Sequence, residues 1–334
     1  MKKYRLNVII LILITFLVMY LVLKDDFNTT VDTIKNVNLF ILIALLFMIL
    51  NIFFQSLSVH NFLKEVKSDY KFIDTFMLMV SALFFNAITP FSSGGQPFQM
   101  YLLRKQGIKV TDSGNVLLQN FFTYQLSLII MGTFSIVINY MFNILPSNTI
   151  LKHIVFVGYL VNLFVLFVLL FLIYAKSINT NLLNKILDFI FNFKFIKNRE
   201  TLKENLKNKI DDFYNSAVYF KNNKKNLFKS LFYNLTSLVM LYIVPLFIFY
   251  SIGEYTSINT LESVALSGYT YLIGSFVPIP GGTGGLEYAF INFFQNFTVG
   301  ASLSAIMILW RFITYYFGMI LGALSLLYFK SEVK

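Results

Sequence analysis

The sequence predicts an all-α integral membrane protein with six full spans and two re-entrant broken-helix hairpins, arranged as an inverted-topology repeat. Hydrophobic residues make up 57% of the 334 residues, and charged residues only 13%. The apolar residues come in runs of about 20, the length that crosses a bilayer as a helix. Two of these runs are interrupted by Pro and Gly, at 89–97 and 278–285, where a helix cannot continue. We expect a single transmembrane domain over 1–334.

The composition excludes several classes of function. The chain has no Cys, which excludes disulfides, thiolate metal sites and Cys nucleophiles. Its two His residues lie far apart in the sequence and lack acidic neighbours, so we expect no metal and no other cofactor. The net charge of +11 is explained by Lys and Arg in cytoplasmic loops. We therefore predict no nucleic-acid partner and a multi-pass protein of the cell membrane.

Two spans precede the first break. Residues 6–23 follow a basic N-terminus, and no A-x-A-like cleavage site follows them. This pattern predicts an uncleaved span with the N-terminus in the cytoplasm. The second span, 39–59, returns the chain to the loop 60–71, which carries three Lys residues, as a cytoplasmic loop should.

The first broken hairpin covers 72–103, with T-P-F-S-S-G-G-Q-P at 89–97. If this segment crossed fully, the basic residues at 104–109 would face outside, and every later loop would change sides. The limb after the break, 91–103, would be about 20 Å long as a helix, against a hydrocarbon core of about 30 Å. Both observations favour re-entry over two further crossings.

The middle of the chain contains spans 113–141 and 151–175, followed by the hydrophilic segment 176–229. That segment has twelve basic and five acidic residues, and its apolar residues recur at helical spacing. We predict basic amphipathic helices on the cytoplasmic membrane surface. Docking of a soluble partner there is the less favoured alternative.

The remaining elements repeat the first half from the opposite face. Span 230–252 contains Pro245, the second broken hairpin covers 263–299, and the last span, 302–329, returns the C-terminus to the cytoplasm. With this topology 23 of the 27 basic residues are cytoplasmic. The halves 6–141 and 151–329 then have the same order of elements in opposite orientations, as in secondary transporters whose sites lie between discontinuous helices.

The second break supplies most candidate ligand-binding residues. The simpler, purely structural interpretation of its glycines is a tight turn. The favoured one is a lipid site in which exposed backbone N–H groups bind an anion. The residues concerned are Pro280, Gly281, Gly282, Gly284 and Gly285.

Two ionisable residues flank that break. Glu287 lies in the returning apolar limb, and Arg311 lies inside the last span. Charges at such depth are expensive, so we expect the two to face each other or a shared polar cavity. A purely structural ion pair and a role for Arg311 in attracting a lipid phosphate both remain open.

The first break is polar but uncharged. Its candidate lipid-binding residues are Gly94, Gly95, Gln96 and Gln99. Further amides lie in adjacent helices, where they serve either as packing contacts or as the lining of a polar cavity. These are Asn86, Gln119, Asn120 and Gln125.

Both breaks carry motifs that resemble a known family, the integral membrane part of the lysylphosphatidylglycerol synthase and flippase proteins, including stand-alone members. The motifs are T-P-F-S-S-G-G-Q-P-F-Q at 89–99, with Leu102-Leu103-Arg104 and Gly107, and P-I-P-G-G-T-G-G-L-E at 278–287, with Trp310-Arg311 and Gly318. The resemblance implies that Pro280, Gly281, Gly282, Glu287 and Arg311 belong to a lipid-handling site. Many members carry charged residues near Gln96, Gln99 and Asn120, which are neutral here, so the headgroup is left open.

The resemblance implies movement of an aminoacylated or anionic phospholipid such as phosphatidylglycerol, or of a related polyprenyl-phosphate lipid, between leaflets. A separate cytosolic synthase is a partner that the resemblance suggests. The first alternative is a phosphatidylglycerol lysyltransferase. We expect no such activity from this chain alone, because 176–229 is too short for a transferase fold. The second alternative is a secondary transporter of a small solute.

Overall fold

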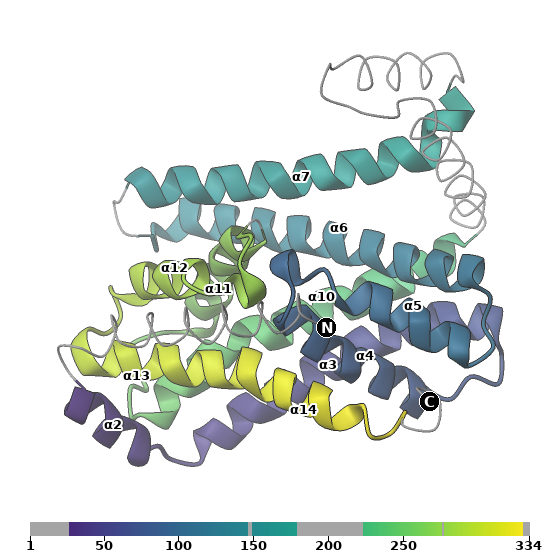
Figure 1. Cartoon of the computed structure of the whole chain (residues 1–334). Coiled ribbons are helices and arrows are strands. Elements are labelled where there is room, and N and C mark those ends of the chain that lie inside the picture. Colours follow the sequence, from purple (N-terminus) through teal and green to yellow (C-terminus); the bar gives the residue numbers. More distant parts are fainter. Residues whose placement is uncertain (1–26, 146–148, 179–222, 276, 330–334) are drawn as a thin grey trace, which may run out of the picture.

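The computed structural model describes residues 27–145, 149–178, 223–275 and 277–329, and every regular element among them is helical. The long helices lie side by side along roughly one direction (Figure 1). The predicted span 6–23 and nearly all of the hydrophilic segment 176–229 fall outside the described residues. Within the rest, the prediction of an all-α membrane fold is confirmed.

Five stretches of helix are long and apolar enough to cross a membrane, and they confirm five of the six predicted spans. They are α3 (Phe40–Val66), α6 (Val110–Phe142), α7 (Thr149–Ile178), α10 (Lys224–Ser251), and α13 (Gly300–Arg311) continuing through η3 (Phe312–Tyr316) into α14 (Phe317–Ser325). Observed and predicted ends differ by a few residues, since helices extend past the apolar run into polar flanks. A short helix that sequence reasoning missed, α2 (Phe27–Lys35), packs on α13.

Both predicted breaks interrupt the helices where Pro and Gly occur. The first hairpin consists of α4 (Phe72–Ala87), the turn η1 (Pro90–Ser92) and α5 (Gly95–Lys105). The second consists of α11 (Thr260–Gly274), η2 (Pro280–Gly282) and α12 (Gly285–Phe294). The α4–α5 hairpin lies toward one end of the bundle and the α11–α12 hairpin toward the other, and η1 contacts η2 (Figure 1).

Basic residues collect at the end of the bundle where the α4–α5 hairpin opens, which we call the basic end. Three segments meet there: the loop 66–72, the loop 105–110 and the start of α10. Tyr70 donates a hydrogen bond to Gln106, which joins the two loops. The carboxylate of Glu65 accepts hydrogen bonds from the Asn residues at 223 and 226, which brings α10 to the same place. The basic residues concerned are Lys64, Lys67, Lys71, Arg104, Lys105, Lys109, Lys224 and Lys225.

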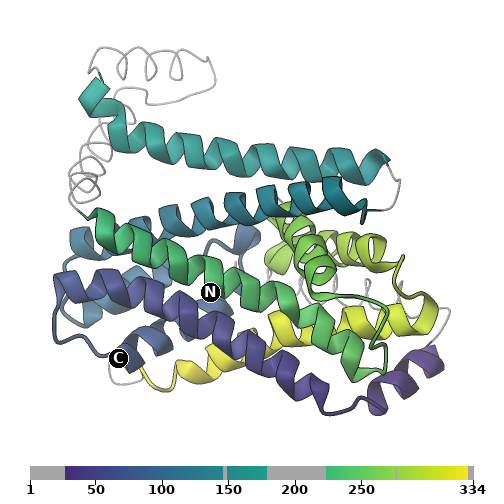
Figure 2. The ribbon, with the colours of Figure 1, turned by 180° about the vertical axis from the view of Figure 1, so that it is seen from behind.

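The helices α3 and α10 pack against each other and run antiparallel (Figure 2). Pro245 lies inside α10 and is buried. The hydroxyl of Ser263 on α11 enters the helical ladder here, because it donates to the Tyr242 carbonyl at 3.0 Å and accepts from Leu246 N–H at 3.2 Å. Ser267 donates to the same carbonyl at 3.0 Å. Side chains of the second hairpin therefore bond the backbone of α10 beside its proline.

Small residues let the hairpins approach their neighbouring spans closely. A Cβ atom at Gly322 of α14 would lie 2.6 Å from the backbone nitrogen of Phe84 on α4. With Gly318 it forms a G-x-x-x-G face, the pattern that lets helix backbones touch in membranes. On the other side, a Cβ atom at Gly268 of α11 would lie 2.2 Å from the Ser135 hydroxyl of α6. These contacts fix each first hairpin limb against a full span.

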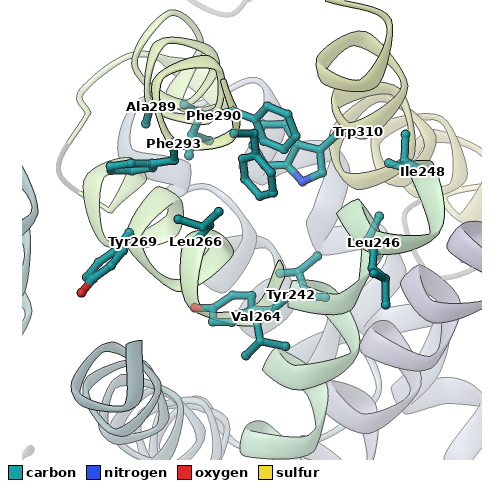
Figure 3. Close-up of a cluster of buried hydrophobic side chains, with 14 of the residues drawn as sticks. Tyr242, Leu246, Ile248, Val264, Leu266, Tyr269, Ala289, Phe290, Phe293 and Trp310 are labelled. Carbon is teal, nitrogen blue, oxygen red and sulfur yellow. The ribbon is translucent and has the colours of Figure 1, made fainter. Parts of the chain in front are cut away.

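The aromatic core lies where the second hairpin packs against α10 and the last span (Figure 3). Phe290 stacks on Trp310 with ring centroids 4.5 Å apart and on Phe294 at 4.2 Å. Tyr242 and Tyr269 belong to the same cluster. The α12 helix is thus anchored to the last span immediately before Arg311.

The two broken hairpins and the helices that follow them begin at matching positions. Pro90 and Pro280 begin the two short turns, Gly95 and Gly285 begin the returning limbs, and Val110 and Gly300 begin the next spans. The separation in sequence is identical in all three pairs. Both turns also share a backbone path, with two consecutive residues at positive φ after the proline.

Candidate functional site

The second break needs its glycines for conformational and steric reasons. Ile279 is extended, as a residue before proline tends to be, and Gly281 and Gly282 follow at φ values of 65° and 64°. A Cβ atom at Gly281 would lie 2.2 Å from the ring of Tyr315. The break is therefore a tightly packed turn against the last span.

The carboxylate of Glu287 caps the helix that starts at the break. Its Oε2 atom accepts from Gly284 N–H at 2.6 Å, and the side chain is 5% exposed. The sequence predicts that such N–H groups receive an anion, and here the protein's own carboxylate takes the Gly284 N–H. Thr283 closes the turn by donating its hydroxyl to the Pro280 carbonyl at 2.9 Å.

Arg311 holds the break against the last span, and we call this arrangement the arginine clasp. Its Nη2 donates to the Gly281 carbonyl at 3.1 Å and to the Thr283 hydroxyl at 3.3 Å. Its Nε lies 2.6 Å from Glu287 Oε1, in an ion pair whose N–H is not aligned for a hydrogen bond. The prediction that Glu287 and Arg311 face each other is confirmed. The clasp neutralises both buried charges within the protein.

A π-helical turn directly after Arg311 orients Tyr315, which sequence reasoning missed. Residues Phe312–Tyr316 form this turn, a form of helix often found at functional sites. The guanidinium carbon of Arg311 lies 4.6 Å from the centre of the Tyr315 ring. The Tyr315 hydroxyl donates to the carbonyl of Ala87, the last residue of α4, at 2.9 Å. One side chain thus contacts both hairpins.

The first break satisfies its own glycine N–H groups. Gly94 N–H donates to the Thr89 hydroxyl and Gly95 N–H to Asn86 Oδ1, each at 2.8 Å. In contrast to the second break, its two left-handed residues are not glycines, since Phe91 has φ 53° and Ser92 has φ 51°. Left-handed backbone is unfavourable for such residues, so this turn is strained.

A family model described as the lysylphosphatidylglycerol synthase TM region matches residues 7–322. The chain belongs to this family. It is therefore a multi-pass membrane protein with a role connected to membrane lipids, and the family implies association with membrane phospholipid. No curated protein matches the chain.

In this member of the lysylphosphatidylglycerol synthase family, the predicted site residues fall into two groups. The arginine clasp joins Gly281, Glu287 and Arg311 directly, with Pro280 and Gly284 as hydrogen-bond partners of its members. In the first break, Gln99 is buried and donates to the Met79 sulfur at 3.0 Å, whereas Gln96 is exposed. A Cβ atom at Gly285 would clash with Val277, and one at Gly282 would clash with Leu286. These two glycines are therefore needed for close packing.

Proposed function

We propose that this protein moves an aminoacylated or anionic phospholipid, or a related polyprenyl-phosphate lipid, between the two leaflets. The observation that carries the proposal is the contact between the two broken hairpins, which open toward opposite ends of the bundle. Each first limb, α4 or α11, is about 22–24 Å long, so each break lies inside a hydrocarbon core of about 30 Å. The polar groups of the two breaks therefore lie at a depth that a headgroup must pass when it crosses the membrane.

Most of the exposed polar side chains near this contact come from the first break. Ser92, Ser93 and Gln96 are exposed, as are Ser275 and Pro278 before the second break. Hydroxyl and amide groups can hydrogen-bond a phosphodiester without the cost of burying a further charge. We assign headgroup contact to these residues and place the arginine clasp beside them as the support that keeps the second break in shape.

The inverted repeat is part of the same proposal. The equal spacing of matching elements and the common path of the two turns support two halves of opposite orientation. In such transporters, one half rocks against the other around a site near the midplane. The strained first break is the one that changes conformation, because the second is held by an ion pair and the first is not.

Leaflet exchange in reconstituted vesicles tests the proposal. We expect the full chain to accelerate exchange of headgroup-labelled phosphatidylglycerol, read by its accessibility to an impermeant quencher. Gln96→Leu should slow this exchange about tenfold, the loss of roughly one good hydrogen bond to a charged group. The matched control is Tyr140→Leu, which changes an exposed side chain near the end of α6. Equal exchange in protein-free vesicles would refute the proposal.

The proposed orientation has a separate test that needs no lipid. Because the chain has no Cys, single cysteines can be introduced freely. We expect Lys105→Cys, at the basic end, to react with an impermeant thiol reagent only after the membrane is permeabilised. Tyr255→Cys, on the opposite loop, should react in intact cells. Labelling of position 105 from outside would contradict both the topology and the cytoplasmic assignment of the basic end.

A further inference from the structure

The turn of the first break carries an aromatic ring that packs little against the rest of the protein. Phe91 is 61% exposed and belongs to neither hydrophobic cluster of the described residues. Two other rings of this hairpin, Phe85 on α4 and Phe98 on α5, stack on each other with centroids 3.9 Å apart. The two limbs of the hairpin are therefore joined by rings other than that of Phe91.

The backbone makes this position an unfavourable one for a phenylalanine. Phe91 has a φ of 53°, in the left-handed region that a side chain with a Cβ avoids. The residue that follows the proline of the second break is Gly281, which adopts a φ of 65° at no such cost. Burial of the Phe91 ring would offset the strain, but the ring is mostly exposed. Strain that packing does not offset is found chiefly at functional sites, so we looked for a ligand that the ring fits.

The depth and the neighbours of Phe91 indicate the chemistry of that ligand. The 16 residues of α4 span about 24 Å, so the turn lies inside a hydrocarbon core of about 30 Å. Next to the ring in the sequence, Ser92, Ser93 and Gln96 are exposed as well. This one turn thus presents an apolar ring beside hydroxyl and amide groups. A phospholipid has the same two parts, since its chains are apolar and its headgroup accepts hydrogen bonds.

We propose that Phe91 binds the acyl chains of an anionic phospholipid whose headgroup contacts Ser92, Ser93 and Gln96. This inference rests on the proposed function and adds to it the part of the protein that contacts the lipid chains. The ring gives the chains an apolar surface next to the polar groups that the headgroup passes. The second break offers no equivalent, because a Cβ atom at Gly281 would already clash with Tyr315.

Tryptophan fluorescence tests the contact without any transport assay. Phe91→Trp places a fluorophore on the turn, and the emission of the single native Trp, the buried Trp310, is subtracted with the native chain. Vesicles contain phosphatidylglycerol and phosphatidylcholine in equal amounts, with brominated chains on one lipid or the other. We expect about twofold stronger quenching when phosphatidylglycerol carries the bromine. The matched control is Phe164→Trp on α7, whose side chain is 66% exposed and should be quenched equally by both lipids.

Phe91→Gly separates the role of the ring from its backbone cost. We expect Tm to rise by about 1–3 °C, because glycine relieves the left-handed strain. Leaflet exchange of phosphatidylglycerol should nevertheless slow about fivefold, since part of an apolar contact is lost. Phe91→Leu keeps an apolar side chain and should retain most of the exchange. Asn143→Gly is the control, since Asn143 at the end of α6 is also left-handed, with φ 50°, and its replacement should leave exchange unchanged.

Three outcomes would overturn the proposal. Equal quenching of Phe91→Trp by the two brominated lipids would mean that the ring faces bulk lipid, as Phe164 does. A lower Tm of Phe91→Gly would mean that the ring serves the packing of the protein. Unchanged exchange in Phe91→Gly would mean that the chains do not use the ring. If the native chain itself does not accelerate exchange, the proposed function fails, and the quenching result alone decides the role of Phe91.

Discussion

Glu287→Gln is expected to destabilise the protein by about 3–5 kcal/mol, because it leaves the guanidinium of Arg311 buried without a counter-charge. The two side chains are each 5% exposed and lie 2.6 Å apart, so solvent cannot replace the lost partner. The same substitution keeps a side-chain oxygen near Gly284 N–H, so the cap of α12 is largely retained. Thermal unfolding in detergent and the yield of folded protein measure the loss.

The double variant Glu287→Gln with Arg311→Met separates folding from lipid movement. We expect it to regain most of the lost stability, since neither buried charge is then left alone. We also expect it to remain inactive in leaflet exchange, because Arg311 no longer holds Gly281 and Thr283 in place. An active double variant would show that the arginine clasp is only a structural ion pair.

An exposed ion pair serves as the control for this series. Asp32 and Lys35 lie 3.5 Å apart on α2 with side chains 68% and 69% exposed. Asp32→Asn should change stability by no more than about 0.5 kcal/mol. A loss comparable with that of Glu287→Gln would show that the detergent-solubilised protein responds to any charge change rather than to burial.

Gly281→Ala is expected to lower stability by about 2–5 kcal/mol. Left-handed backbone costs a residue with a Cβ about 1–2 kcal/mol, and the forced contact with the Tyr315 ring adds about 1–3 kcal/mol. Because Tyr315 also reaches Ala87 of the first hairpin, displacement of its ring should slow leaflet exchange as well.

Gly107→Ala measures the backbone part of that effect alone. Gly107 has φ 83° and no atom within 4 Å of the position of a Cβ, so only the backbone cost applies. We expect a loss of about 1–2 kcal/mol and unchanged leaflet exchange. Equal losses in the two variants, measured by thermal unfolding, would contradict a tight contact between Gly281 and Tyr315.

Most of the fold could be predicted because its determinants are local. Apolar runs set the spans, Pro and Gly at 89–97 and 278–285 set the breaks, and the unequal distribution of Lys and Arg favours re-entry. The short helix α2 was missed, because nine residues with little overall hydrophobicity do not stand out beside the apolar spans. The positive φ of Phe91 and Ser92 was also not predictable from residue type, since the fold imposes it against their preference.

The two charged members of the candidate site could be predicted, but most of their contacts could not. Glu287 and Arg311 stood out because ionisable residues are rare in apolar segments. The π-helical turn at Phe312–Tyr316 has no sequence period of its own, so the orientation of Tyr315 could not be predicted from the sequence. One signal was available, since Tyr315 follows Arg311 by four residues and shares its helix face. The exposure of the Phe91 ring depends on the path of the turn and is visible only in the fold.

The hydrogen bonds from Ser263 to the backbone of α10 affect how the chain is inserted during biosynthesis. The Tyr242 carbonyl and the Leu246 N–H are both bonded through a hydroxyl that is synthesised after α10 itself. Before that hydroxyl is made, Pro245 leaves this turn of α10 short of one backbone donor, and an unpaired backbone group in lipid costs several kcal/mol. We therefore expect the newly inserted helix to stay next to the translocation channel, where water or protein can hydrogen-bond its backbone, until the second hairpin is inserted. Insertion of α10 and α11 would then be a single joint event, and a nascent chain arrested between them should remain crosslinkable to the channel.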